Sequence, residues 1–357
     1  MSILVYFGIA LFVLLIQFPI TAWSMKRLQC ERSLSSSTAF AGESGEMIET
    51  MRNYSPFIIP WVRLESHISP HLLLGKQESL QVLHDTYYAS MFAMLPYQQI
   101  RRVHKIRYLR RGEYDLGGAS ISCSDLLGVA RYSVLEEESP KILVYPALLG
   151  DDRVPALLSQ QLGEISRRRQ LMEDPFLIRG LRAYQPGDPV RDIHWPATAR
   201  VGQVQVRVHD YSAKTKLLVV LNIQGRDMQW QDKLPEKQEE SMEYAISLAA
   251  TICVRALNNG LSAGFATNTS ADDTRDTIVQ MPTEGAGTEE ALLSTMARLK
   301  TDRHQHFPVF LKQLPVDDEV DVLILSHYDN DEIRQARQEL ENKGCQVTFH
   351  LLEGGQV

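Results

Sequence analysis

Residues 215–222 read TKLLVVLN, and this uninterrupted aliphatic run decides the fold class of the chain. A strand that is apolar on both faces is typical of a parallel sheet covered by helices on both sides. Downstream, helix-like segments alternate with strand-like ones, such as VDVLILS at 320–326 and CQVTFHLL at 345–352. The alternation predicts an α/β domain built on a mostly parallel, Rossmann-like sheet.

The segment upstream of this strand is rich in arginine and contains an unusual turn. A Pro-Gly pair ending at Gly187 predicts the turn, Asp188 an N-cap, and Pro189 the first residue of a short helix. Arg191 and Trp195 are four residues apart, so they are expected to share one face of that helix.

A strand is predicted after this helix. Residues 203–209 (QVQVRVH) alternate, with the valines turned toward a core and the polar residues outward. We expect this strand to pair with the apolar strand at 215–222.

Further upstream, residues 51–148 show short alternating runs broken by Arg-Gly and Gly-Gly pairs, which predict a small β-sandwich-like domain. Residues 26–50 are rich in serine and glycine and predict a flexible linker. A connecting helix is expected within residues 149–178, so that residues 179–357 hold the arginine-rich segment and the α/β domain.

The amino terminus is apolar over residues 3–23 and carries no charge there. About twenty such residues are long enough to cross a bilayer as a helix. Lys26, Arg27 and Arg32 follow the run, and nothing basic precedes it. The positive-inside rule then predicts a transmembrane anchor over residues 1–25, a single-pass location in the cell membrane, and a body facing the cytoplasm.

Composition narrows the class of function. The chain has 357 residues and a net charge of -7, which argues against a general nucleic-acid binder. Its four cysteines are scattered, with no Cys-x-x-Cys pair, so reduced buried thiols are expected rather than a disulfide framework or a zinc site.

The arginine-rich segment resembles the signature of the domain of unknown function 58 family, Arg-x-Tyr-x-Pro-Gly-Asp-x-x-Arg-x-Ile-x-Trp-Lys-x-x-Ala-Arg. The residues that match it are Arg182, Tyr184, Pro186, Gly187, Asp188, Arg191, Ile193, Trp195, Ala199 and Arg200. Pro196 stands where the family has lysine, so the role of that lysine does not carry over. A proline there is expected to break or kink the helix begun at Asp188.

The resemblance further implies that the carboxy-terminal half is similar to a von Willebrand factor type A domain. Such domains often hold Mg²⁺ in an Asp-x-Ser-x-Ser loop after the first strand. Here the matching loop carries Asn222, Gln224 and Arg226, so that an amide replaces the leading carboxylate and a cation the last hydroxyl. We expect a degenerate loop with no metal and no cofactor, with Asp227 and Asp329 as the nearby carboxylates.

Two functions fit the arginine-rich segment. A hydrolase-type enzyme would use Asp188, Asp192 and His194 as acid/base groups and the arginines as anion clamps. However, Asp192 and His194 are two residues apart and do not face each other on a helix, and no strained Ser or Cys nucleophile is present. We therefore expect no enzyme, but a clasp, including His194, that packs the β domain against the α/β domain.

The resemblance implies a membrane-anchored adaptor or scaffold that binds protein partners. The family tends to accompany MoxR-type AAA+ ATPases and membrane transglutaminase-like proteins, which are the partners expected here. With the metal loop degraded, contacts at the carboxyl edge of the sheet would be metal-free.

Overall fold

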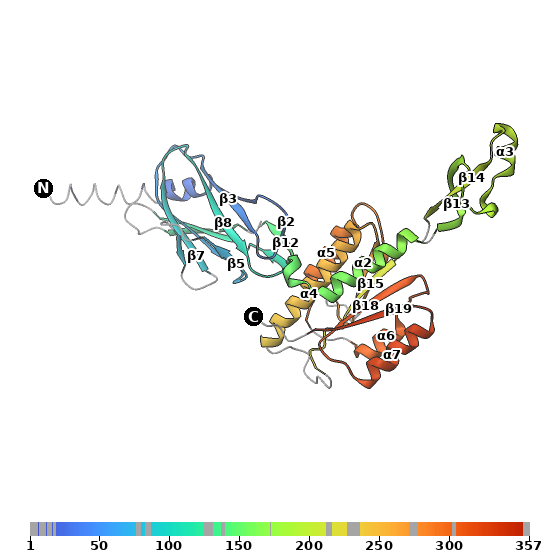
Figure 1. Ribbon diagram of the computed structural model, residues 1–357. Coiled ribbons are helices and arrows are strands. Elements are labelled where there is room, and N and C mark those ends of the chain that lie inside the picture. The colour runs from blue at the N-terminus through green and yellow to red at the C-terminus, as the bar shows by residue number, and fades with distance from the viewer. Residues whose placement is uncertain are drawn as a thin grey trace. The chain divides into compact units, whose positions relative to one another are not determined.

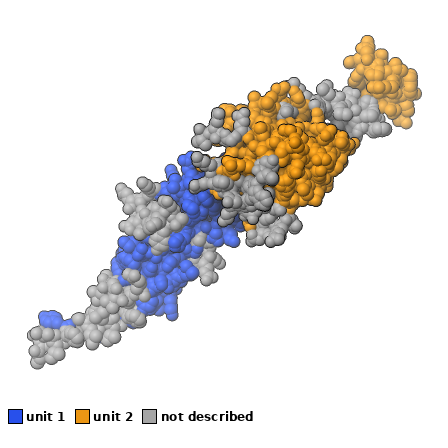
Figure 2. Space-filling model, turned by 90° about the horizontal axis from the view of Figure 1, so that it is seen from below, with its two compact units in different colours: residues 1–147 blue, residues 148–357 orange. Residues whose placement is uncertain are grey.

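A computed structural model of the chain describes residues 6, 12, 16, 19–75, 80–82, 87–116, 118–124, 131–136, 140–171, 173–211, 216–226, 236–270, 277–301 and 305–352. The chain divides into two compact units, Met1–Ala147 and Leu148–Val357, which Figure 2 colours separately. The fold is mixed α/β, and strands dominate its first unit (Figure 1).

The predicted transmembrane anchor over residues 1–25 is wrong. Within the described part of the chain, no helix is long and apolar enough to cross a membrane. Most of the predicted span lies outside the described residues. Its last residues, 19–25, are helical and end at Met25, which is 5% exposed and packs in the core of the first unit. The predicted single-pass location with a body facing the cytoplasm is not supported either.

The first unit forms three antiparallel or mixed sheets among the described residues. The sheet orders are β1-β3-β8-β5, β11-β10-β4-β7-β6 and β2-β12-β9. The strands are β1 (Leu28–Leu34), β2 (Thr38–Phe40), β3 (Ser44–Asn53), β4 (Ile59–His67), β5 (Leu72–Leu74), β6 (Leu80–Val82), β7 (Tyr87–Met94), β8 (Gln99–Tyr108), β9 (Gly112–Asp115), β10 (Ala119–Ser124), β11 (Arg131–Glu136) and β12 (Lys141–Tyr145).

The predicted flexible linker over residues 26–50 is wrong, because this segment supplies β1, β2 and most of β3. β1 pairs along its whole length with β3, from Leu28 opposite Asn53 to Leu34 opposite Met47. The segment is rich in serine, but residues 28–34 alternate between half-buried and exposed positions, as expected for a strand at the edge of a sheet. The β domain therefore begins well before residue 51.

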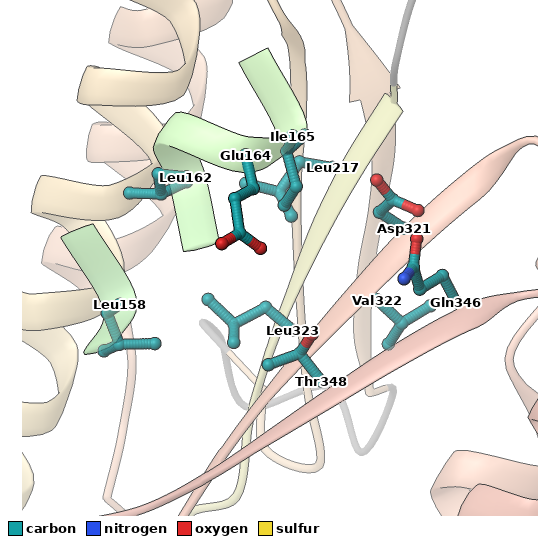
Figure 3. Close-up of a pocket in the computed structure, with 10 residues that line it drawn as sticks. All are labelled: Leu158, Leu162, Glu164, Ile165, Leu217, Asp321, Val322, Leu323, Gln346 and Thr348. Carbon is teal, nitrogen blue, oxygen red and sulfur yellow. The ribbon is translucent and has the colours of Figure 1, made fainter. Parts of the chain in front are cut away.

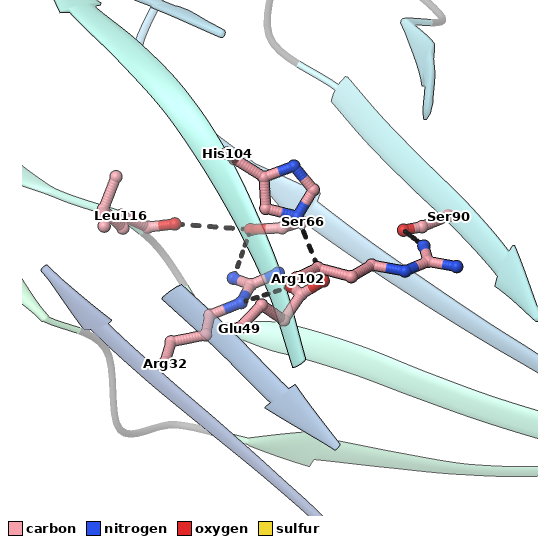
Figure 4. A network of polar contacts seen from close by, with 7 residues as sticks. All are labelled: Arg32, Glu49, Ser66, Ser90, Arg102, His104 and Leu116. Carbon is pink, nitrogen blue, oxygen red and sulfur yellow. Dashed lines mark hydrogen bonds and ion pairs between the residues drawn. The ribbon is translucent and has the colours of Figure 1, made fainter. Parts of the chain in front are cut away.

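A polar network is buried inside the first unit (Figure 4). Arg32 Nε donates to Glu49 Oε1 at 3.2 Å, and Nε2 of His104 lies 3.5 Å from Glu49 Oε2. Arg32 Nη1 also donates to Ser66 Oγ at 2.8 Å, and Ser66 Oγ donates to the Leu116 carbonyl. The side chains of Arg32, Glu49 and His104 are 6%, 4% and 1% exposed. The network therefore joins β1, β3 and β8 of one sheet to β4 of the other.

Glu49 is charged within this network. Burial alone would raise the pKa of Glu49, but contact with the His104 ring and the charge of Arg32 outweigh burial and lower the pKa below its ordinary value. The fold of the first unit thus depends on a buried ion pair as well as on its apolar core.

The second unit begins with a helix that is fastened to its neighbour. Helix α2 (Ala156–Leu171) follows a short 3-10 turn. Before it, the Leu149 N–H donates to Thr251 Oγ1 at 2.9 Å, and Asp151 forms an ion pair with Arg255 at 2.7 Å. Thr251 and Arg255 belong to helix α4 (Glu236–Asn258), so the segment that leads into α2 is held against that helix.

The core of the second unit is a five-stranded sheet in the order β17-β16-β15-β18-β19. β15, β16, β18 and β19 run parallel, and β17 is antiparallel at one edge. Its elements are β15 (Lys216–Leu221), α4 (Glu236–Asn258), β16 (Ser262–Thr267), β17 (Ile278–Thr283), α5 (Thr288–Arg298), α6 (Phe307–Gln313), β18 (Val320–Ser326), α7 (Asp331–Asn342) and β19 (Gln346–Leu351). The predicted central strand is β15.

Side chains of the sheet alternate between two covered faces. Leu218 and Val220 of β15 pack with α6 and α7, in a cluster that includes Phe307 and Ile333. Leu217 and the other alternate residues of β15 point to the opposite face, where α2 and α4 lie (Figure 1). This two-sided cover is why β15 is apolar throughout.

Candidate functional site

The arginine-rich segment folds as a lobe of two strands and a short helix, called here the hairpin lobe (residues 173–211). It consists of β13 (Glu173–Ala183), β14 (Gln205–Tyr211) and, between them, α3 (Trp195–Val201). β14 pairs antiparallel with β13. The predicted pairing of this strand with β15 is therefore wrong. β15 has no free side for it, because β16 and β18 occupy both of its edges.

The turn of the hairpin lobe is held by one ion pair. Arg182 donates hydrogen bonds from Nη1 to Asp188 Oδ2 at 2.7 Å and from Nη2 to Asp188 Oδ1 at 2.6 Å. The Gln185 N–H also donates to Asp188 Oδ2, at 2.8 Å. Gly187 has φ +110°, which the turn requires and which a residue with a side chain rarely adopts. Hydrogen bonds from Arg182 and Gln185 lower the pKa of Asp188. Asp188 therefore locks the turn, and it does not cap a helix as predicted.

The helix starts at Trp195 instead, because His194 is its N-cap. His194 Nδ1 accepts a hydrogen bond from the Ala197 N–H at 3.1 Å. Pro196 lies in the first turn of α3, where a missing N–H costs nothing, so it does not break the helix. Gly202 ends the helix with φ +74°. His194, proposed as an acid/base group in the alternative function, has a capping role here.

Arg191 and Trp195 do not share a helix. Val190–Asp192 form a separate 3-10 turn, and the Arg191 side chain is 86% exposed, with its Nε 3.8 Å from Asp192. The predicted one-face pairing of Arg191 and Trp195 is therefore wrong. The chain changes direction at Ile193, which makes an isolated bridge to Val206.

The predicted clasp between the two domains stays a prediction. Trp195 is 63% exposed and Tyr184 40%, and Arg200 is exposed on α3. Of the valines expected to face a core, Val206 is 2% exposed but Val204 is 36% exposed. Among the lobe side chains that the structure describes, several large aromatic and aliphatic ones therefore lie at the surface.

The second predicted site, the degenerate metal loop, lies at the carboxyl edge of the sheet between β15 and β18. Asn222 is fully buried and donates from Nδ2 to Ser326 Oγ at 3.0 Å, while its Oδ1 accepts from the Gln224 N–H at 3.0 Å. Ser326 Oγ in turn donates to the Tyr328 carbonyl at 2.7 Å. Neutral hydrogen bonds thus occupy the polar atoms of Asn222.

The same bonds continue to the next loops. Gln224 Oε1 accepts from the Phe307 N–H at 2.9 Å. The Ile223 N–H donates to Asn268 Oδ1 at 3.0 Å, and Asn268 Nδ2 donates to the Gln305 carbonyl at 3.0 Å. Sequence reasoning missed Asn268 and Ser326. Asn268 directly follows β16, and Ser326 is the last residue of β18. This position at the ends of neighbouring strands was the signal that could have found them, because parallel strands end at one edge.

Charged groups are held away from this buried amide network. Arg226 is exposed. Asp329 Oδ2 accepts from Arg334 Nε at 3.1 Å, and Asp227 lies outside the described residues. In the described ranges, no group of three His, Cys, Asp or Glu side chains could hold a metal ion.

A histidine and a serine meet beside the same edge. His327 Nε2 lies 2.8 Å from Ser241 Oγ of α4. Burial lowers the pKa of His327, although its contact with Ser241 opposes this. His327, which follows the strand where a metal-binding domain has a carboxylate, thus favours its neutral form and links β18 to α4.

We expect Mg²⁺ to have no effect on stability. A ligand that binds the native state raises the unfolding temperature, and the amide network offers no carboxylate to a divalent cation. Differential scanning fluorimetry in millimolar Mg²⁺ and in EDTA checks this, with Ca²⁺ as a second hard cation. A rise in melting temperature with Mg²⁺ would contradict the prediction.

Comparison with known proteins places the hairpin lobe and the first part of the sheet in one family match. Residues 180–309 match the family described as protein of unknown function DUF58. The chain is also 20% identical over 246 residues to the uncharacterized protein YeaD of Bacillus subtilis (strain 168), covering 68% of this chain and 56% of that protein. The chain thus spans about half the length of this relative.

Two solved structures each resemble about a third of the chain. An alpha-2-macroglobulin of Salmonella is 14% identical, covers 33% of this chain and 9% of its own, and has a TM-score of 0.27. A type II cohesin domain from the cellulosome of Acetivibrio cellulolyticus is 12% identical, covers 32% and 94%, and has a TM-score of 0.25. TM-scores this low do not define a shared fold.

Proposed function

We propose that the protein is an adaptor that binds a protein partner through the hairpin lobe. One observation carries the proposal: the lobe is ordered by its own turn and caps, yet it leaves Val190, Trp195 and Val201 exposed at 70%, 63% and 64%. Large apolar side chains exposed on the 3-10 turn and on α3 favour an interaction surface over a core.

The composition of this surface supports a protein partner. Tryptophan, tyrosine and arginine dominate binding energy at protein interfaces. The lobe exposes Trp195 and Tyr184, and it carries the exposed arginines Arg191 and Arg200. Arg182 pairs closely with Asp188, at 2.6 Å, whereas Arg191 lies 3.8 Å from Asp192 and its side chain is 86% exposed, so Arg191 and Arg200 are better placed than Arg182 to meet a partner.

The buried amide network supports a metal-free mode of binding. The sheet order is that of an open doubly wound domain, and in such domains ligands bind at the carboxyl edge of the strands. If the domain is similar to a von Willebrand factor type A domain, as the sequence resemblance implies, its metal loop has become a structural hydrogen-bond network. Partner recognition then depends on side chains.

The partner to test first is a MoxR-type AAA+ ATPase, with a transglutaminase-like protein as the second. The tagged full-length chain is used for a pull-down from its own cells in mild detergent, and the affinity for the purified partner is then measured. We expect Trp195→Ala to weaken binding about 30-fold, the effect of a central aromatic anchor worth about 2 kcal/mol.

Two further variants make this test specific. Arg191→Glu reverses an exposed charge with little structural role, and we expect it to weaken binding while the melting temperature stays unchanged. Leu135→Ala alters a side chain of β11 that is as exposed as Trp195, at 63%, and should leave binding unchanged. Equal affinity of all three variants and the wild type would rule out the hairpin lobe as the docking surface.

A further inference from the structure

We propose that the hairpin lobe recognises a partner segment in which carboxylate side chains alternate with apolar ones. The proposal rests on the proposed function and deepens it, because it names the chemistry of the bound segment. Between Gly180 and Val208 the chain carries four arginines, two aspartates and no lysine or glutamate. This part of the lobe is thus locally basic in a chain whose net charge is -7.

The two aspartates of this part of the lobe are mostly buried, whereas its arginines reach the surface. Both oxygens of Asp188 accept hydrogen bonds from Arg182, and the Asp188 side chain is 13% exposed. The Asp192 side chain is 19% exposed. The Arg191 side chain, in contrast, is 86% exposed, and Arg200 is exposed in the last turn of α3. The charge that this surface presents to a partner is therefore positive.

A further guanidinium lies on β14. Arg207 stands opposite Leu181 of β13, and its side chain is half-buried. Its Nε is buried and has no hydrogen-bond partner in the described part of the chain. A buried N–H without an acceptor is costly, and a charged donor forms its strongest hydrogen bonds with an anion such as a carboxylate. Arg207 therefore keeps hydrogen-bonding capacity for a carboxylate from outside the chain.

Apolar side chains stand next to the exposed arginines in the sequence. Val190 precedes Arg191 and Val201 follows Arg200, and these valines are 70% and 64% exposed. Trp195 lies between the two pairs. A segment that covers the valines and the indole also removes water from the guanidinium groups beside them. It must therefore carry carboxylates that replace this water, as well as apolar side chains.

Phosphate groups would also meet the arginines, but the remaining chemistry favours a peptide. Single-stranded nucleic acids bind through aromatic side chains on which successive bases stack. Val190 and Val201 offer aliphatic surface instead. The chain as a whole is acidic, which opposes the approach of a polyanion. A peptide with both carboxylates and apolar side chains matches both kinds of side chain on the lobe.

Another surface of the second unit has acidic residues and provides a reference for the location of binding. A cavity of about 180 Å³ between α2 and the sheet is lined by Glu164 and Asp321 among aliphatic side chains (Figure 3). Glu164 is exposed. Because carboxylates repel one another, we expect an acidic segment to bind the lobe and not this cavity.

The experiment is an NMR titration of the full chain. It follows the indole N–H of Trp195 and, beside the cavity, the backbone amides of Leu158 and Leu162. The probes are the capped peptide Asp-Leu-Asp-Phe-Asp-Leu-Asp, its counterpart with asparagine in place of aspartate, and an oligothymidylate of equal charge. We expect the aspartate peptide to shift the Trp195 signal and to bind about tenfold more tightly than either other probe. The leucine signals should stay unchanged.

Four results would overturn the proposal. No binding of the aspartate peptide would refute it, and equal affinity of the asparagine peptide would remove the preference for carboxylates. Binding of the oligothymidylate as tightly as the aspartate peptide would indicate a nucleic-acid ligand instead. Shifts of the leucine signals without a shift of the Trp195 signal would place the peptide at the cavity.

Matched variants separate charge from docking. Arg191→Gln combined with Arg200→Gln should weaken the aspartate peptide about tenfold, to the affinity of the asparagine peptide. Arg101→Gln, at an exposed position of β8, should leave both affinities unchanged. Trp195→Ala should weaken both peptides by the same factor. This variant therefore tests the proposed function, whereas the ratio of the two affinities tests the preference for carboxylates. A tenfold ratio that survives the double arginine variant would contradict the inference.

Discussion

Replacing Glu49 by glutamine is expected to lower the free energy of unfolding of the first unit by about 3–5 kcal/mol, because it leaves the buried Arg32 guanidinium without its counter-charge. Both side chains are less than a tenth exposed, so water cannot replace the lost partner. Hydrogen–deuterium exchange of β3, β4 and β8 at rising urea concentration measures the effect in the full chain.

The same ion pair predicts how the first unit responds to acid. The folded-state pKa of Glu49 lies below the ordinary value of 4.5, so its stabilising effect is complete above the unfolded pKa and is lost as pH falls through the folded pKa. Glu49→Gln removes this contribution. Wild type and variant should therefore differ most at neutral pH and converge in acid.

A control on the same strand makes the comparison sharp. Glu46 of β3 is exposed, and Glu46→Gln should change stability by no more than about 0.5 kcal/mol. Replacing Arg32 and Glu49 together by apolar residues should recover much of the loss, since the penalty belongs to the unpaired charge. A Glu49→Gln variant as stable as Glu46→Gln would show that the buried pair contributes nothing.

Placing a carboxylate at position 222 is expected to be as destabilising as the loss of Glu49. We expect Asn222→Asp to lower the free energy of unfolding of the second unit by about 3–5 kcal/mol at neutral pH, because it places an uncompensated charge at a fully buried site. It also removes the amide hydrogen that Ser326 Oγ accepts. Exchange of β15 and β18 amides reports the loss.

The sign of the pH dependence is opposite to that of Glu49. Burial raises the pKa of an aspartate, so the native state of the variant binds more protons than its unfolded state, and stability falls as pH rises. The variant should regain stability in mild acid. Asn222→Leu, which is neutral at every pH, leaves the Gln224 N–H without its acceptor and removes the donor to Ser326 Oγ, and this variant should show no such recovery.

The response to Mg²⁺ shows whether the loop of the Asn222→Asp variant can bind a metal ion. If a carboxylate at position 222 were enough for binding, Mg²⁺ would raise the stability of Asn222→Asp strongly by pairing with this carboxylate. We expect no rescue, because Gln224 and Asn268 are committed to backbone bonds across three loops. A Mg²⁺-dependent recovery of stability would contradict the conclusion that the loop is structural.

The second unit was largely predictable, because its strands and helices are long and strongly patterned. TKLLVVLN predicts β15 as an apolar run, and VDVLILS and CQVTFHLL predict β18 and β19, with helix-like segments alternating with them. The prediction missed the short helix α6. Its first residue, the bulky Phe307, and Pro308 in its first turn were available signals. Seven residues offer too few turns for a periodicity to appear.

The start of the helix in the hairpin lobe is predicted wrongly for a specific physical reason. The residues Asp188 and Pro189 favour an N-cap at Asp188 and a helix that continues through Trp195. In the structure, Arg182 binds Asp188 in the turn, His194 caps the helix, and the helix begins only at Trp195. Propensity identifies a turn and a helix, but it does not show which of several candidate residues makes the cap.

In the first unit, the sequence did not predict which charged residues are buried. Composition suggested a loose tether at residues 26–50, yet Arg32 and Glu49 from this segment make its central buried pair. His104 stands among basic residues of β8 in the sequence, and it is 1% exposed. A single sequence cannot show which charged residues meet across two sheets, because their partners lie far apart in the chain.

The way the hairpin lobe is attached has a practical consequence. Its two strands leave and rejoin the rest of the chain side by side, with Glu173 opposite Tyr211. A short turn could therefore replace residues 174–210 without stretching the backbone on either side. The hairpin lobe is in this sense a separable segment, and we expect that residues 174–210 can be excised, or transplanted onto another scaffold, while the five-stranded sheet stays folded.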